Sequence, residues 1–121
     1  MMNLLWVGAG GFIGATARYS VAALMNRWVG RDTFPWATLT VNMVGCFVIG
    51  LLAVFFEKRW TAHPAATLFV FAGFLGSFTT FSTFGYDTVM LVQRARPLAA
   101  VTNGLAQLVC GCLLVAMGMG V

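Results

Sequence analysis

The chain has 121 residues, enough for one domain. Apolar residues make up 60% of it and charged residues only 8%, against roughly 25% in an average soluble domain. So few charges cannot cover a soluble protein of this size, and the net charge of +4 comes mostly from arginines at the ends of apolar runs. The composition therefore excludes a soluble enzyme, a nucleic-acid-binding module and a disordered chain, and it indicates a membrane protein.

Four apolar stretches follow one another along the chain. They lie at about residues 4–25, 36–56, 65–92 and 98–121. Each is long enough for a membrane-spanning helix, which needs about 20 apolar residues. A proline stands at the start of the second, third and fourth stretches, where its missing N–H costs nothing. The sequence predicts an all-α integral membrane protein whose single transmembrane domain, 1–121, contains four transmembrane helices.

The first stretch is rich in glycine between residues 8 and 14. The segment looks like a dinucleotide-binding fingerprint, but the alternating strands and helices that this motif requires do not follow. Gly10 and Gly14 are four residues apart, and such a pair lets two membrane helices approach closely. We interpret the segment as a helix-packing surface.

The second stretch carries an asparagine inside the predicted span. Asn42 lies one helical turn beyond Thr38, so both side chains face the same way. An uncharged amide with two N–H donors could replace part of the water around an anion without holding it permanently. An interhelical hydrogen bond explains the same residue equally well.

The third stretch has an unusual density of Gly, Ser, Thr and Phe between Gly73 and Gly85, which is poor for a continuous helix. We expect a break near residues 76–80. Backbone freed at membrane depth must line a polar cavity or be buried in protein, where carbonyls can hold a cation and N–H groups an anion. Phe81 and Phe84 share a helix face and could present their positive ring edges to an anion, although such pairs are more often plain core.

The fourth stretch carries two stripes. Asn103 and Gln107, four residues apart, form a polar one. Gly104, Gly111 and Gly118 repeat every seven residues and form a smooth one suited to helix contact. The two stripes suggest one edge that faces a pore and one that faces a partner.

The basic residues of the polar joints give only a weak preference for one orientation in the membrane. One side of the membrane would carry Lys58 and Arg59, and the other would carry Arg27, Arg31, Arg94 and Arg96. A chain with so small a bias could insert both ways, which permits an antiparallel dimer without demonstrating one.

Three segments form a recognisable combination. They are Gly10-Gly11-Phe12-Ile13-Gly14 followed by Arg18-Tyr19, the run Thr38-Leu39-Thr40-Val41-Asn42-Met43-Val44-Gly45, and the run Gly76-Ser77-Phe78-Thr79-Thr80-Phe81-Ser82-Thr83-Phe84. Together they resemble the Fluc or CrcB family of bacterial fluoride channels, and the resemblance covers all four stretches. It implies a dual-topology homodimer of two antiparallel subunits, with two separate fluoride pores and a sodium ion buried at the centre.

The resemblance also implies residue roles. Asn42 would be the pore asparagine, Phe81 and Phe84 would line the ion path with their ring edges, and Ser82 and Thr83 would be polar neighbours on the broken helix. By its helical spacing from Asn42, Thr38 would lie on the same face and so also line the pore.

Further roles concern the sodium ion, the vestibule and the fourth helix. Gly76 and Thr79 would supply backbone carbonyls around sodium. Arg18 and Asp87 would sit toward the aqueous vestibule, with Arg18 attracting anions. The family commonly has hydroxyl side chains along the fourth span, where this chain places the amides of Asn103 and Gln107 in the fluoride pore.

The implied function is passive, fluoride-selective export across the bacterial inner membrane by a multi-pass protein that is not an enzyme. Its partners would be fluoride, membrane lipid and a second copy of the chain. Two alternatives remain open at this point. A small proton-coupled cation or drug antiporter would depend on an intramembrane carboxylate, for which only Asp87 is available, and an accessory subunit held by its glycine faces would transport nothing.

Overall fold

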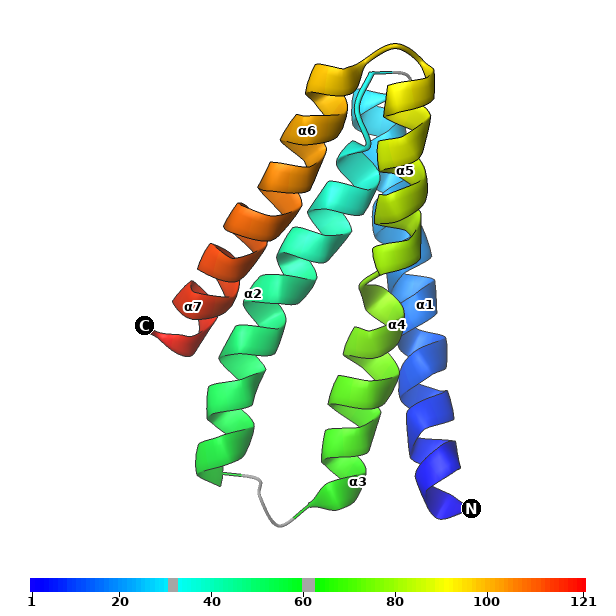
Figure 1. The fold of residues 1–121 in the computed structure, drawn as a ribbon. Coiled ribbons are helices and arrows are strands. Elements are labelled where there is room, and N and C mark those ends of the chain that lie inside the picture. Colours follow the sequence, from blue (N-terminus) through cyan, green and yellow to red (C-terminus); the bar gives the residue numbers. More distant parts are fainter. Residues whose placement is uncertain (31–32, 60–62) are drawn as a thin grey trace.

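The computed structural model describes residues 1–30, 33–59 and 63–121, and all its regular elements are helical (Figure 1). The first two helices are α1 (Met2–Val29) and α2 (Trp36–Arg59). The third follows as α3 (Pro64–Thr67), η1 (Leu68–Leu75), α4 (Gly76–Phe78) and, after a break, α5 (Phe81–Gln93). The fourth consists of α6 (Pro97–Leu105), η2 (Ala106–Cys110) and α7 (Gly111–Met119), and both η segments are π-helical. The predicted all-α architecture is confirmed.

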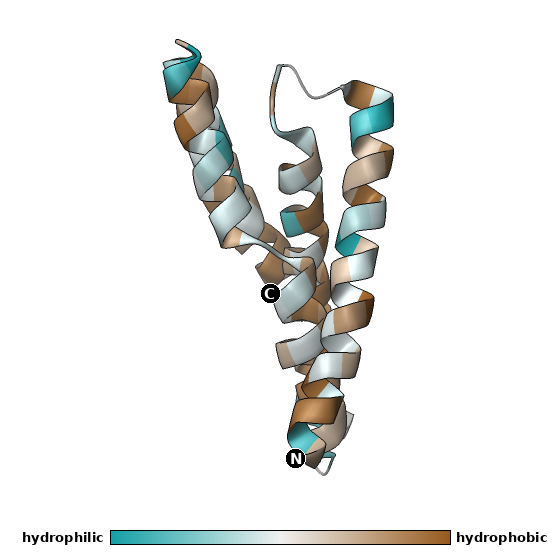
Figure 2. Cartoon of the chain, turned by 90° about the vertical axis from the view of Figure 1, so that its right-hand side faces the viewer, coloured by the Kyte–Doolittle hydropathy of each residue, from teal (hydrophilic) through white to brown (hydrophobic). Residues whose placement is uncertain are grey.

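Three of the described helical segments are long and apolar enough to cross a membrane, namely Trp36–Lys58, Pro64–Gln93 and Pro97–Met119. They agree with the second, third and fourth predicted spans. The first prediction, 4–25, falls within α1, which is 28 residues long but is not among these three. Arg18 and the many glycines lower its hydropathy. Figure 2 shows hydrophobic residues along most of each helix, with strongly hydrophilic ones near helix ends and at a few positions part-way along.

Glycines bring α1 and the third helix into backbone contact. A Cβ atom on Gly10 would collide with the carbonyl group of Phe69, and one on Gly14 with that of Phe74. From the other side, a Cβ on Gly73 would stand 2.6 Å from the carbonyl oxygen of Val7. The predicted packing role of Gly10 and Gly14 is therefore confirmed.

The glycine stripe of the fourth helix was predicted to face a partner, but the structure shows a different arrangement. A Cβ on Gly118 would collide with the carbonyl oxygen of Phe47, and one on Gly111 would lie 3.4 Å from the sulfur of Cys46. Both contacts are with α2 of the same chain. Gly104 has open space around its missing side chain. Two of the three glycines thus serve packing within the chain, which spacing alone could not distinguish from packing against a partner.

The third helix is interrupted where the sequence predicts. Thr79 is extended, with φ −80° and ψ 155°, and Thr80 follows with φ −149° and ψ 115°. The Oγ1 atom of Thr80 accepts a hydrogen bond from the N–H of Thr83 at 3.4 Å, so Thr80 is the N-cap from which α5 restarts. Figure 1 shows the break part-way along the bundle, between α4 and α5.

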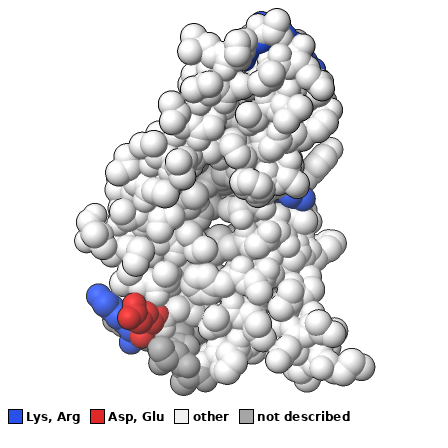
Figure 3. All heavy atoms as spheres, in the orientation of Figure 1, with Lys and Arg blue, Asp and Glu red and all other residues white. Residues whose placement is uncertain are grey.

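Large apolar side chains cover much of the surface, as lipid contact requires. Among the described residues the buried apolar side chains are few: Val41, Leu75, Phe78, Leu91 and Ala100. Figure 3 shows basic residues at the end of the bundle with the α1–α2 and α5–α6 connections, and basic and acidic ones near the far end of α2. Between them the visible surface is uncharged except for one basic patch about half-way along. This distribution matches a chain whose ends face water and whose middle faces hydrocarbon.

Candidate functional site

Asn42 reaches from α2 to the break in the third helix. Its Oδ1 atom accepts a hydrogen bond from the N–H of Thr80 at 2.9 Å, and its Nδ2 atom donates to the carbonyl oxygen of Thr80 at 3.1 Å. One amide side chain therefore satisfies both backbone groups of an extended residue that cannot form helical bonds. These two bonds hold the break open.

The same amide also contacts the fourth helix. Nδ2 of Asn42 donates to Oε1 of Gln107 at 3.1 Å, so both N–H groups of Asn42 are occupied. The Nε2 atom of Gln107 is buried and has no hydrogen-bond partner. Gln107 lies in the π-helical η2 segment, and π-bulges are frequent at functional sites.

Two backbone carbonyls lose their usual partners at the break. In a continuous helix the N–H of Thr80 would donate to the carbonyl of Gly76, but here it donates to Asn42. The N–H of Thr83 would donate to the carbonyl of Thr79, but here it donates to the hydroxyl of Thr80. The carbonyls of Gly76 and Thr79, which the resemblance assigns to sodium, are thus released by the capping bonds of the break.

Phe81 and Phe84 begin α5 and lie beside each other, with ring centroids 5.6 Å apart and planes inclined by 57°. Both line a groove of about 480 Å³ together with Asn42, Thr80 and Gln107. Phe81 is 82% exposed in the single chain, so one side of this groove is open. The structure brings together four of the predicted pore residues here. Ser82, although next to Phe81, is exposed and does not line the groove.

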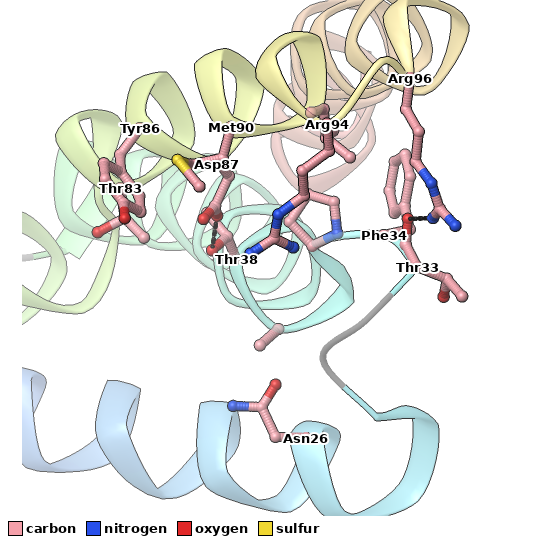
Figure 4. Close-up of a pocket in the computed structure, with 13 residues that line it drawn as sticks. Asn26, Thr33, Phe34, Thr38, Thr83, Tyr86, Asp87, Met90, Arg94 and Arg96 are labelled. Atoms are coloured by element: carbon pink, nitrogen blue, oxygen red, sulfur yellow. Dashed lines mark hydrogen bonds between the residues drawn. The ribbon is translucent and has the colours of Figure 1, made fainter.

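A second cavity, of about 300 Å³, lies between the ends of α1 and α5 and the start of α2 (Figure 4). Thr38 is buried there and donates a hydrogen bond from Oγ1 to Oδ2 of Asp87 at 2.7 Å. Thr83 and Arg94 also line it. Thr38 and Thr83 therefore lie in a different cavity from Asn42, and Asp87 lies with them.

Besides Ser82, two predicted residues line neither cavity. Arg18 is half-buried on α1. Asn103 is fully buried, and its Nδ2 atom donates to Oγ1 of Thr88 at 3.0 Å, while Thr88 donates to the carbonyl oxygen of Phe84 at 2.8 Å. The Oδ1 atom of Asn103 has no partner. Asn103 thus supports the helix that carries the phenylalanines.

Sequence reasoning missed Thr80 and Thr88. Thr80 had a local signal, because threonine is a common N-cap residue. Its side-chain oxygen can accept a hydrogen bond from the backbone N–H three residues further along the chain. Its contact with Asn42 had none, since the two residues are 38 positions apart and on different helices. Thr88 had none either, because its partner Asn103 lies beyond the α5–α6 turn.

Comparison with known proteins bears directly on this arrangement. Residues 5–119 match the family described as CrcB-like protein, Camphor Resistance (CrcB). A protein of Salinibacter ruber named fluoride-specific ion channel FluC is 41% identical over 99% of this chain and 89% of its own. Proteins of the same name from Magnetococcus marinus and Acidobacterium capsulatum are 41% and 39% identical, each over 98% of this chain and 95% and 94% of their own.

Proposed function

The chain belongs to the CrcB-like family, and on this premise we propose that it is a fluoride-selective channel through which fluoride leaves the bacterial cell passively. The observation that carries the proposal is the broken third helix beside the groove of Asn42, Phe81 and Phe84. A channel of this kind converts no substrate and is not an enzyme.

The start of α5 provides positively polarised groups that could surround an anion. The first N–H groups of a helix lack intrahelical partners, and the helix dipole adds positive potential at the same point. Thr80 caps only the N–H of Thr83, which leaves the N–H groups of Phe81 and Ser82 without a capping side chain. The ring edges of Phe81 and Phe84 add weakly positive hydrogens. Fluoride that sheds water in the groove would exchange it for these groups.

Sodium is the proposed cofactor at the other side of the break. The carbonyls of Gly76 and Thr79 lie in the last turn of the continuous helical run α3–η1–α4 and at its C-cap, where the helix dipole is negative. Backbone carbonyl oxygens are hard ligands suited to an alkali cation at a broken membrane helix. When bound, sodium would neutralise this concentration of partial negative charge near the anion path.

A second copy of the chain would complete the site. The groove is open beside Phe81, and most of each spanning segment is unburied in the single chain. We propose an antiparallel, dual-topology homodimer with lipid around it and four spans per subunit, α1 included. The weak charge bias between the two ends of the helices supports insertion in both orientations.

The driving force needs no coupled reaction. Hydrogen fluoride crosses membranes as a neutral acid and releases fluoride in a near-neutral cytoplasm. An inside-negative inner-membrane potential then moves the anion outward by about 2.3 kcal/mol for every 100 mV. Uncharged groups that bind fluoride weakly, such as amides and ring edges, would let the ion leave again.

The decisive experiment measures efflux from liposomes that contain the purified protein and are loaded with fluoride or chloride. We expect rapid fluoride efflux and negligible chloride efflux, against protein-free liposomes as the control. Absence of fluoride efflux contradicts the proposal. Proton-coupled uptake of a cation that is lost in Asp87→Asn, without fluoride flux, would favour the antiporter instead.

A further inference from the structure

The segment α5 carries both phenylalanines of the groove, but the break leaves its rotation about its own axis unfixed by the helix before it. In a continuous helix, hydrogen bonds between successive turns fix the direction of each side chain. Here the N–H of Thr80 bonds to Asn42, and the N–H of Thr83 bonds to the hydroxyl of Thr80. Contacts with other helices must therefore determine which way Phe81 and Phe84 point.

Two consecutive residues of α5 accept hydrogen bonds from two different helices. The Oδ2 atom of Asp87 accepts a bond from Oγ1 of Thr38 on α2 at 2.7 Å (Figure 4). The Oγ1 atom of Thr88 accepts a bond from Nδ2 of Asn103 on α6 at 3.0 Å. Consecutive side chains project about 100° apart around a helix axis. A rotation of α5 in either direction would therefore stretch these bonds, and together they oppose it.

The donors of the two bonds are held firmly by their own surroundings. Thr38 is 8% exposed and Asn103 is fully buried, so neither side chain can follow a rotating helix. The hydroxyl of Thr88 also donates to the carbonyl oxygen of Phe84 at 2.8 Å. Asn103 is thus linked through one oxygen atom to the backbone of a phenylalanine that lines the groove.

On the basis of the proposed function, we propose that Asp87 and Thr88 form a rotational clamp that sets the selectivity of the channel for fluoride. Neither residue lines the groove, so both are positioning residues that act through the rings of Phe81 and Phe84. A ring lies about 5–6 Å from the helix axis, and a rotation of about 20° would move it by about 2 Å. This displacement exceeds the difference in diameter between fluoride and chloride ions. Loss of the clamp should therefore admit chloride.

The test compares Thr88→Val with Thr102→Val in liposomes loaded with fluoride or chloride. Each substitution removes a hydroxyl that donates to the carbonyl four residues earlier, but Thr88 also accepts a bond from another helix. We expect Thr88→Val to lower the ratio of fluoride to chloride efflux about threefold to tenfold, the worth of one hydrogen bond between uncharged groups. Thr102→Val should keep the ratio of the unsubstituted protein. Thr88→Ser should keep it as well, because it retains the hydroxyl.

A double variant separates the orientation of α5 from the stability of the fold. In Thr88→Val alone, the buried Nδ2 atom of Asn103 loses its partner, which destabilises the protein. Adding Asn103→Leu replaces both partners by apolar groups of similar shape, a change that can be nearly neutral for stability. We expect the double variant to regain thermal stability but to keep the lowered efflux ratio, because apolar contacts do not fix a direction.

The outcomes distinguish the clamp from a purely structural pair. Recovery of the efflux ratio together with thermal stability in the double variant would overturn the inference. Thr38→Val, which removes the other bond, should lower the ratio as Thr88→Val does, and an unchanged ratio in either single variant would overturn the inference as well. Absence of fluoride efflux from the unsubstituted protein would instead contradict the proposed function itself.

Discussion

The third helix is held on its two sides by opposite kinds of contact. Toward α1, glycines place backbone directly against backbone, as at Gly14 and Phe74. Toward α2, the amide of Asn42 forms hydrogen bonds with the extended backbone of Thr80, and Gln107 of the fourth helix accepts a bond from that amide. The first contact leaves no space between the helices, whereas the second borders a groove of about 480 Å³.

The difference shows how a membrane protein can combine a rigid scaffold with a polar path. Lipid is as apolar as the side chains, so close van der Waals packing must supply much of the attraction between helices. The glycine contact provides this packing where no chemistry is required. The amide contact provides hydrogen bonds where the backbone must stay open. Substitutions on the side of α1 should therefore destabilise the protein through steric overlap. Substitutions on the side of α2 and the fourth helix should act through the loss of a hydrogen-bond donor.

The largest effect should come from Asn42→Asp. The carboxylate cannot donate, so it loses the bonds to the carbonyl of Thr80 and to Oε1 of Gln107. A charge at membrane depth also costs about 2.5–3.5 kcal/mol. A fluoride ion would in addition meet a negative charge at low dielectric. We expect fluoride efflux from liposomes to fall to the protein-free level.

The matched control is Asn3→Asp, which makes the same chemical change at an exposed position near the start of α1. It should leave efflux unchanged. Unchanged efflux of Asn42→Asp would remove Asn42 from the pore and from the support of the break.

A smaller effect is expected from Gly14→Ala on the glycine side. The added methyl group collides with the backbone carbonyl of Phe74, and such overpacking costs about 1–3 kcal/mol. The free energy of unfolding in a titration with denaturing detergent measures it. Gly8→Ala is the control, because nothing lies within 4 Å of its added Cβ, and it should be neutral or stabilising by up to about 1 kcal/mol. Equal results for both variants would show that α1 and the third helix do not depend on this approach.

Features that depend on the local sequence could be predicted, whereas features that depend on how the helices are placed relative to one another could not. The apolar stretches, the Gly10 and Gly14 pair and the break near Thr79 follow from composition and spacing. The position of Thr38 does not. Residues four apart lie about 6 Å apart along a helix axis, so Thr38 and Asn42 reach cavities at different depths although they share a face.

The hydrogen bonds of the Asn42 amide could not be predicted, for the same reason. The sequence singles out Asn42 and Gln107 as polar residues in spans, but 65 positions separate them. Only the translation of α2 relative to the third and fourth helices decides whether they meet. The resemblance assigns both residues to the ion path. The structure shows that the Asn42 amide is occupied by the backbone of Thr80 and by Oε1 of Gln107, whereas the Nε2 atom of Gln107 has no partner.

The smallest effect should come from Thr80→Val, which tests the cap of α5 alone. Valine keeps the branched shape suited to the extended backbone of Thr80, and the bonds of its peptide group to Asn42 remain. The substitution removes the hydroxyl that accepts from the N–H of Thr83 and donates to Oγ1 of the same residue, a loss of about 1 kcal/mol in the free energy of unfolding. Thr102→Val is the control, because its hydroxyl only donates to the carbonyl of Leu98 within an intact helix. If Thr80→Val instead abolished efflux as Asn42→Asp should, the hydroxyl rather than the Asn42 amide would hold the break, and the contrast between the two sides of the third helix would have to be redrawn around Thr80.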